Sequence, residues 1–157
     1  MLSGGSVVSL HIAAAAAASM QTFDWVEAVA ARGIAGDRYF SGLGTYSNHP
    51  GGGRQVTLIE SEAIRALERE YGIELNAGLA RRNIVTVGVA LNHLVEKTFT
   101  IGAVRLRGKR LCEPCRHLEG LTRQGAMRGL IHRGGLRAEI ISGGIIRIGD
   151  SIMPVES

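Results

Sequence analysis

The sequence has few cysteines, few aromatic residues and no long apolar segment, and each shortage excludes a class of protein. Two cysteines three positions apart cannot form a disulfide framework for a chain of this size. Aromatic residues make up 4% of the chain and lysines form no run, so bases of nucleic acid would find few stacking platforms. No run of about 20 apolar residues predicts a membrane span, and the GxxxxGK[ST] and strand-linked GxGxxG patterns of nucleotide binding are absent. We therefore expect neither nucleic acid nor a membrane as a partner.

What the sequence does contain is typical of one compact domain. The chain has 157 residues, of which 45% are hydrophobic and 20% charged, and this composition is globular. The 22 glycines are scattered, as tight turns and bulges between short strands require. The formal net charge is +4, and this mild basic excess favours a small anionic ligand. We predict a single domain over residues 1–157.

The apolar segment from Val7 to Ala18 loosely resembles a signal peptide. No lysine or arginine precedes it, however, and His11 interrupts it. We instead predict a first strand over Ser6–Ile12 and a loop over Ala13–Met20, and we expect a cytoplasmic protein.

Alternating and β-branched segments predict eight or nine short strands and one or two helices. Ala63, Ile64 and Leu67 give a helix that begins near Ser61 an apolar face, and Gly72 is predicted to end it. A second short helix is predicted over Leu121–Leu130. The fold class is mostly β, a closed and barrel-like sheet with attached helices, α+β by element count. The predicted strands are Val7–Ile12, Trp25–Ala30, Arg54–Ile59, Asn83–Val87, Lys97–Ile101, Val104–Arg107, a hairpin of Arg137–Ile141 with Ile145–Ile148 around Ser142–Gly144, and a last strand after Gly149–Asp150, while Ser41–Gly53 is predicted to be a loop.

The chemistry of the chain centres on the segment Cys112-Glu-Pro-Cys115. A CxxC pair serves as metal ligands, as a redox disulfide or as one reactive thiolate. Zinc would have to recruit His117 and another histidine such as His132, because no second CxxC exists. A thioredoxin-type role requires a βαβ context that the flanks lack, and Arg116 stands where a c-type haem motif needs histidine. Two inert cysteines also remain open.

Cys115 is the candidate for a reactive thiolate. If a helical turn opens at Pro114, backbone N–H groups near Cys115 favour an anion, and Arg116 and His117 add positive potential. Both effects lower the pKa of a thiol, whereas Glu113 and Glu119 act in the opposite direction.

Three further segments carry candidate binding residues. Asp37 and Arg38 lie in a glycine turn, where they form either a surface ion pair or a pair that orients a loop. Arg81, Arg82 and Asn83 precede an apolar strand, and guanidinium forks suit a phosphate. The stretch His132-Arg-Gly-Gly-Leu-Arg137 combines backbone N–H groups near Gly134 with the charge of Arg133, which suits an oxyanion. A structural role is the favoured interpretation of Asp37 and Arg38, and ordinary solvated charge that of Arg81, Arg82 and Asn83, whereas a plain glycine-rich turn explains the His132–Arg137 stretch as well as an oxyanion site does.

Taken together and in order, these segments resemble the MOSC domain, named for the C-terminal domain of molybdenum cofactor sulfurases. The resemblance spans nearly the whole chain. It rests on Gly33-Ile-Ala-Gly-Asp-Arg-Tyr39, Arg54-Gln-Val-Thr-Leu-Ile59, Arg81-Arg-Asn-Ile-Val85, Ile101-Gly-Ala-Val-Arg-Leu-Arg107, Cys112-Glu-Pro-Cys115, Arg133-Gly-Gly-Leu-Arg137 and Gly143-Gly-Ile-Ile-Arg-Ile-Gly-Asp150.

The resemblance implies a β-rich barrel, and either binding of the molybdenum cofactor or carriage of sulfur on a cysteine. It implies Cys115 as molybdenum ligand and catalytic residue, with Arg81 and Asn83 near the cofactor phosphate. The chain lacks the N-terminal β-barrel of the mitochondrial amidoxime reducers and the pyridoxal domain of the sulfurase, so pyridoxal phosphate is not expected. Cys112 is an extra thiol. The full set of predicted cofactor-binding residues is Arg81, Asn83, Arg82, Asp37, Arg38, His117, His132, Arg133 and Gly134.

Three functions follow as hypotheses. The first is a molybdenum oxidoreductase that reduces N-hydroxylated bases or related N-oxygenated small molecules, with electrons from an external reductase. The second is a carrier of the cofactor, or of a persulfide on Cys115, for an accepting enzyme. The third is an interaction domain with a vestigial site.

Overall fold

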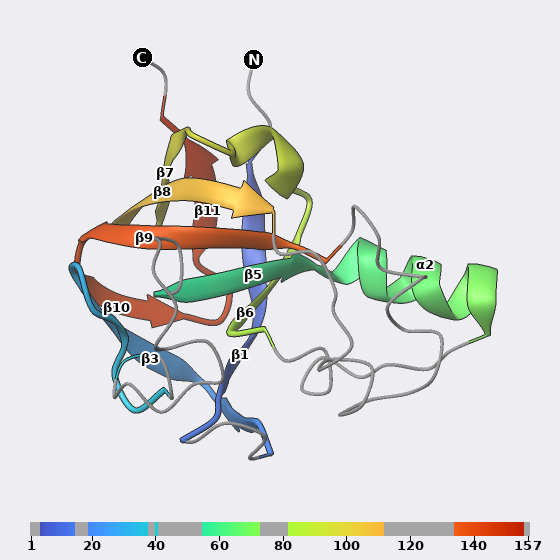
Figure 1. Ribbon diagram of the computed structural model, residues 1–157, viewed down its shortest axis with the longest axis horizontal. Coiled ribbons are helices and arrows are strands. Elements are labelled where there is room, and N and C mark those ends of the chain that lie inside the picture. The colour runs from blue at the N-terminus through green and yellow to red at the C-terminus, as the bar shows by residue number, and fades with distance from the viewer. Residues whose placement is uncertain are drawn as a thin grey trace.

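The computed structural model describes residues 4–14, 19–37, 40, 55–72, 82–111 and 134–155. Within these residues the chain forms a closed β-barrel with a small second sheet and one α-helix (Figure 1). The mostly β prediction is thus confirmed. The elements are β1 (Gly5–Ile12), β2 (Gln21–Phe23), β3 (Trp25–Val29), β4 (Gly33–Ile34), β5 (Val56–Glu60), α2 (Ser61–Tyr71), β6 (Ile84–Val87), the 3-10 helix η1 (Leu91–Leu94), β7 (Thr98–Ile101), β8 (Val104–Leu111), β9 (Leu136–Ser142), β10 (Gly144–Arg147) and β11 (Ser151–Pro154).

The barrel runs in the order β11-β7-β8-β9-β5-β6-β1 and closes where β11 pairs with β1. The closing pair joins Gly5 to Ile152, so the first and last described strands lie side by side (Figure 1). Closure removes free strand edges. β2 adds to the outside of β1, and the second sheet has the order β10-β3-β4.

The parallel pair β5–β6 is joined through α2, as a parallel connection requires. Ala63 and Leu67 on the helix are buried, and the helix ends at Gly72, whose φ of 67° is left-handed and whose N–H donates to the Glu68 carbonyl at 2.8 Å. The predicted helix and its stop are therefore confirmed.

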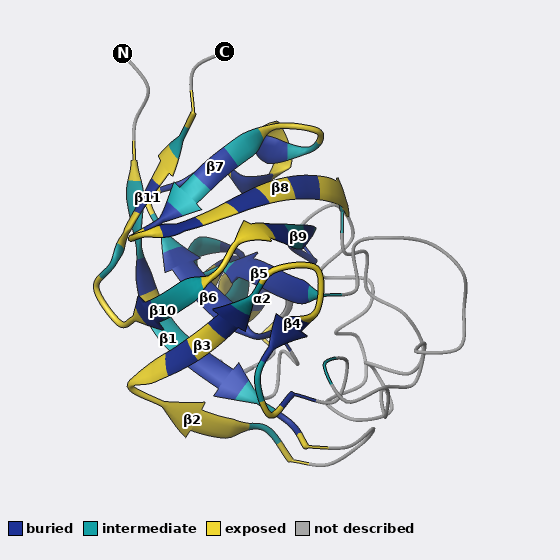
Figure 2. Ribbon diagram, turned by 90° about the vertical axis from the view of Figure 1, so that its left-hand side faces the viewer, coloured by how far each residue is buried: buried dark blue, intermediate teal, exposed yellow. Residues whose placement is uncertain are grey.

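The core inside the barrel is apolar. Buried and exposed residues alternate along β8, as expected for a strand with one face toward this core (Figure 2). Its fully buried side chains include Leu10, Leu58, Ile84, Phe99, Ile101, Leu106, Leu136 and Ile152.

The predicted hairpin between Arg137–Ile141 and Ile145–Ile148 is wrong. Both strands exist, but β9 pairs with β8 and β5, whereas β10 pairs with β3 in the second sheet. The reason is that both edges of β9 are already occupied, so the chain leaves the barrel at Gly143–Gly144. A Cβ on Gly143 would lie 2.5 Å from the Ala28 carbonyl oxygen, so glycine permits this crossing.

The other predicted strands match observed ones to within a few residues. β1, β3, β6 and β7 begin or end one or two residues from their predicted bounds, and β8 continues beyond Arg107 to Leu111. The short strands β2 and β4 and the helix η1 were not predicted. The predicted loop over Ser41–Gly53 and the predicted helix over Leu121–Leu130 lie outside the described residues.

Candidate functional site

A layer of buried polar side chains lies on the outer side of the barrel wall. Leu10, Leu58 and Ile84 point into the barrel, so their neighbours His11, Thr57 and Asn83 face the opposite way. These three polar residues are nonetheless only 3%, 7% and 4% exposed. We call His11, Thr57, Arg82 and Asn83 the outer polar cluster.

Asn83 is the centre of the outer polar cluster. Its Oδ1 accepts hydrogen bonds from the Thr57 amide at 3.1 Å and the Thr57 hydroxyl at 3.2 Å. Its Nδ2 donates to the His11 carbonyl at 3.1 Å, and the His11 amide donates to the Asn83 carbonyl at 2.8 Å. One side chain thus links β1, β5 and the start of β6, which explains an amide at this position without any ligand.

Both ring nitrogens of His11 lie next to hydroxyl groups. Its Nε2 lies 2.8 Å from the Ser9 hydroxyl and its Nδ1 lies 3.3 Å from the Thr22 hydroxyl. Burial disfavours the charged ring and lowers the pKa of His11 below its usual 6.5. A protonated His11 would have to donate from both nitrogens, so the two hydroxyls would both serve as acceptors.

Arg82 joins two segments that are about fifty residues apart in the sequence. Its Nε donates to the Gly134 carbonyl at 2.8 Å, and its side chain is buried. The next residue, Gly135, has φ of 106°, and a Cβ there would collide with the Leu58 carbonyl oxygen. Glycine is therefore required for the chain to cross β5 at this point, next to Arg82.

Asp37 connects the Gly33–Asp37 segment to the same region. Its Oδ1 accepts a hydrogen bond from the Ala13 amide at 3.2 Å, two residues beyond His11, and Asp37 is fully buried. The interpretation of Asp37 as a residue that orients a loop is consistent with this contact.

Strand pairing places Leu111, the last described residue before Cys112. Leu111 ends β8 and pairs with Leu136 of β9. Leu136 also pairs with Leu58 of β5, and Leu58 pairs in turn with Ile84 of β6. Leu111 is followed in the chain by Cys112, and Leu136 follows Gly134 and Gly135. The pairing therefore places the end of β8 beside the start of β9.

The structure brings four predicted residues to one end of the barrel, namely Asp37, Arg82, Asn83 and Gly134. His11 and Thr57, which sequence reasoning did not identify as site residues, hold Asn83 in place. Their only signal in the sequence was a polar residue next to apolar, inward-facing residues of a strand. The remaining predictions lie outside the described residues, namely Cys115, Arg81, Arg38, His117, His132 and Arg133.

Within the described part of the chain, no group of three or more His, Cys, Asp or Glu side chains is arranged to hold a metal ion. No helix among the described residues is long and apolar enough to cross a membrane.

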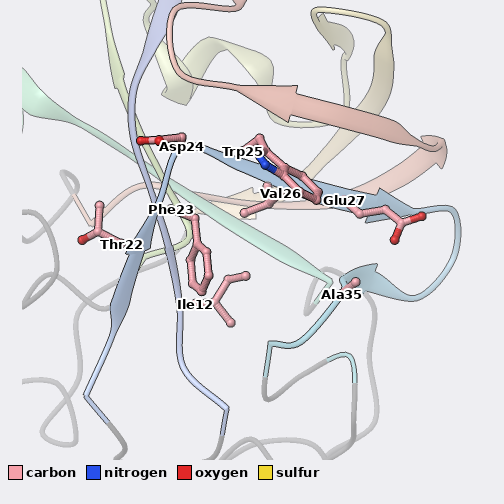
Figure 3. A pocket seen from close by; sticks show the side chains of 8 residues that line it. All are labelled: Ile12, Thr22, Phe23, Asp24, Trp25, Val26, Glu27 and Ala35. Atoms are coloured by element: carbon pink, nitrogen blue, oxygen red, sulfur yellow. The ribbon is translucent and has the colours of Figure 1, made fainter.

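A hollow of about 540 Å³ opens beside this end of the barrel, between β1, β2, β3 and β4 (Figure 3). Its wall includes Ile12, next to His11, and Ala35, two residues before Asp37. The hollow therefore adjoins the residues that the structure brings together.

The chain belongs to the MOSC domain family, because the model of that family matches residues 45–153. This match includes Arg82, Asn83, Cys115 and Gly134. Comparison with curated proteins gives no match.

Solved structures share the fold. The YuaD protein of Bacillus subtilis superposes with a TM-score of 0.77 at 17% identity, over 95% of this chain and 94% of that one. YiiM of Geobacillus stearothermophilus gives 0.73 at 15% identity, over 97% of this chain and 75% of YiiM. YiiM of Escherichia coli gives 0.68 at 14% identity, over 97% and 70%. At these identities the similarity establishes the fold alone.

Proposed function

We propose that the protein binds the molybdenum cofactor, with Cys115 as the metal ligand, and reduces N-hydroxylated bases or related N-oxygenated small molecules. Membership of the MOSC family supports the cofactor, because this family is linked to molybdenum cofactor binding. The single observation that carries the assignment to this end of the barrel is the hydrogen bond from Arg82 Nε to the Gly134 carbonyl at 2.8 Å.

That bond supports the proposal because it joins two segments that each suit an anion. Arg81 precedes Arg82 in the chain and Arg133 precedes Gly134, so two further guanidinium groups belong to the joined segments. Arginine provides planar, bidentate donors for phosphate oxygens. Arg81 and Arg133 therefore suit an anionic cofactor by their chemistry, and in the proposal they bind its phosphate.

The remaining residues have distinct proposed roles. Arg82 and Asn83 act as positioning residues, because their side chains bond to Gly134, Thr57 and His11. Asp37 and Arg38 orient the turn beside β1, and His117 and His132 add positive charge near the cofactor. The Cys115 thiolate is a soft donor that suits molybdenum.

The bound cofactor would supply a two-electron redox centre. Reduction of a hydroxylamine consumes two electrons and two protons, breaks the N–O bond and releases an amine and water. The electrons come from an external reductase, which we propose as the partner in the cytoplasm.

The test uses cofactor-loaded protein, a hydroxylamine substrate and an artificial electron donor. We expect amine formation by the native protein and loss of at least about 100-fold in Cys115→Ser, on the scale seen when a catalytic group is removed. Cys112→Ser is the matched control and keeps most of the activity. Full activity in Cys115→Ser would contradict the assignment.

The alternative function is that of a carrier, and the presence of Cys112 as a second thiol favours it. A carrier would hold the cofactor, or a persulfide on Cys115 that Cys112 resolves, for an accepting enzyme. Bound cofactor without any turnover in the same assay would favour it.

A further inference from the structure

The hollow beside β3 has an aromatic and aliphatic wall. Ile12, Phe23, Trp25, Val26 and Ala35 contribute apolar surface to it. Trp25 is 57% exposed and Phe23 38% exposed, although large aromatic side chains are usually more buried than this. Figure 3 shows the Phe23 ring beside Ile12, with Trp25 and Glu27 projecting from β3. The hollow has the size of a site for a small organic molecule.

Among the described residues that line the hollow, the charged ones are Asp24 and Glu27, and both are acidic. This is the reverse of the whole chain, whose formal net charge is +4. Among the described residues, the ion pair that the structure records joins Lys109 to Glu139, away from this wall.

The nearest basic residue by strand pairing is Arg147. It lies opposite Trp25 on β10, while Ile145 lies opposite Glu27. Directly opposite residues of an antiparallel pair share one face of the sheet, so Arg147 lies on the same face as Trp25 and Glu27, although it is not among the described residues that line the hollow. On the other side, the Ala35 amide donates to the Glu27 carbonyl at 2.9 Å, which fixes the backbone of β3 against β4.

An aromatic face next to a carboxylate is the arrangement that binds organic cations. The π-face attracts the positive charge, and the carboxylate attracts it further. We infer that this hollow binds a small organic ammonium ion with a flat apolar body, which lies on Trp25 and Phe23 and directs its charge toward Glu27.

This inference goes beyond the proposed function and does not depend on it. It needs neither molybdenum nor Cys115, and the described residues that line the hollow lie between Ile12 and Ala35.

The experiment uses the full-length protein without added cofactor. Trp25 is the single tryptophan, so fluorescence excited selectively at tryptophan reports on the surroundings of Trp25. The probes are benzylammonium, the neutral and nearly isosteric benzyl alcohol, and the anion benzoate. We expect saturable quenching by benzylammonium with half-saturation at roughly 1 mM, at least about fivefold weaker binding of benzyl alcohol, and no saturation with benzoate. N-acetyltryptophanamide corrects for collisional quenching.

Two variants separate charge from shape. Glu27→Gln should weaken benzylammonium binding about fivefold and leave benzyl alcohol unchanged, as expected for one partly exposed charge pair. Glu68→Gln on the exposed face of α2 is the matched control and should change nothing. Trp25→Leu, followed by ligand-observed NMR, should weaken binding at least about fivefold.

The inference is overturned if benzylammonium and benzyl alcohol bind equally well. It is also overturned if quenching does not saturate, or if Glu27→Gln and Glu68→Gln behave alike. None of these three results would affect the molybdenum content or the reductive assay, so failure here is distinct from failure of the proposed function.

Discussion

The two sides of the barrel wall are both buried, but they are built from different chemistry. On the inner side of β1, Leu10 joins a cluster of aliphatic side chains. On the outer side, His11 is also buried, yet both ring nitrogens have hydroxyl partners. Apolar packing is non-directional, whereas buried hydrogen bonds fix specific atoms. The comparison teaches that the inner side closes the barrel and the outer polar cluster positions the segments that carry the candidate site.

The largest expected effect is on the unfolding free energy. It compares a glycine whose substitution would make a side chain collide with the backbone with a glycine whose substitution would only strain its own backbone conformation. Gly135→Ala should cost more than about 4 kcal/mol of unfolding free energy or prevent folding, because its Cβ would collide with the Leu58 carbonyl where Arg82 binds Gly134. Gly149→Ala is the matched control, since Gly149 has φ of 90° but a Cβ there would meet no atom within 4 Å. It should cost about 1–2 kcal/mol. Urea denaturation measures both, and equal losses would refute the crossing argument.

The next effect compares two adjacent residues at the start of β6, namely Asn83 on the outer side of the barrel wall and Ile84 on the inner side. Asn83→Ala leaves the buried Thr57 amide and His11 carbonyl without a side-chain partner, and should lower the unfolding free energy by about 2–4 kcal/mol. Ile84→Val on the inner side should cost about 1 kcal/mol.

The amount of bound molybdenum should also distinguish the two variants. In cofactor-producing cells, Asn83→Ala should also lose bound molybdenum, whereas Ile84→Val should keep it. If Asn83→Ala retained both native stability and full molybdenum content, the outer polar cluster would not position the site.

The smallest effect is a pH dependence from His11. Because its folded pKa is lowered, the unfolded state binds a proton first as pH falls, so stability is complete above about 6.5 and declines below it. Glu60 acts in the opposite sense, because burial raises its pKa above 4.5 and protonation at low pH relieves that cost. The difference between the native protein and His11→Gln isolates the histidine.

Denaturation at pH 7.5 and pH 5.5 measures this difference. The native protein should lose more stability on acidification than His11→Gln does. Parallel changes in the two proteins would show that His11 does not titrate as a buried group.

The sequence predicted most of the barrel because its signals are local. Alternation in Trp25–Val29 and the left-handed stop at Gly72 act within a few residues, and both were found. The hairpin of Arg137–Ile141 with Ile145–Ile148 failed, because strand pairing depends on which edges are already occupied by β5 and β8. No local pattern contains that information.

The individual segments of the candidate site could be predicted from the sequence, but their arrangement in space could not. Arg82, Asn83, Asp37 and Gly134 were identified as separate segments, but their convergence depends on hydrogen bonds across 24 to 72 positions in the chain. His11 and Thr57 were missed, because an isolated polar residue in a strand gives no sign of the partner that it holds.

Elemental mass spectrometry of molybdenum tests the central claim most directly. The native protein, Cys115→Ser and Cys112→Ser would be purified from cells that make the cofactor. We predict near-stoichiometric molybdenum in the native protein and in Cys112→Ser, and its loss in a folded Cys115→Ser. Equal molybdenum in all three proteins, or none in the folded native protein, would contradict the account.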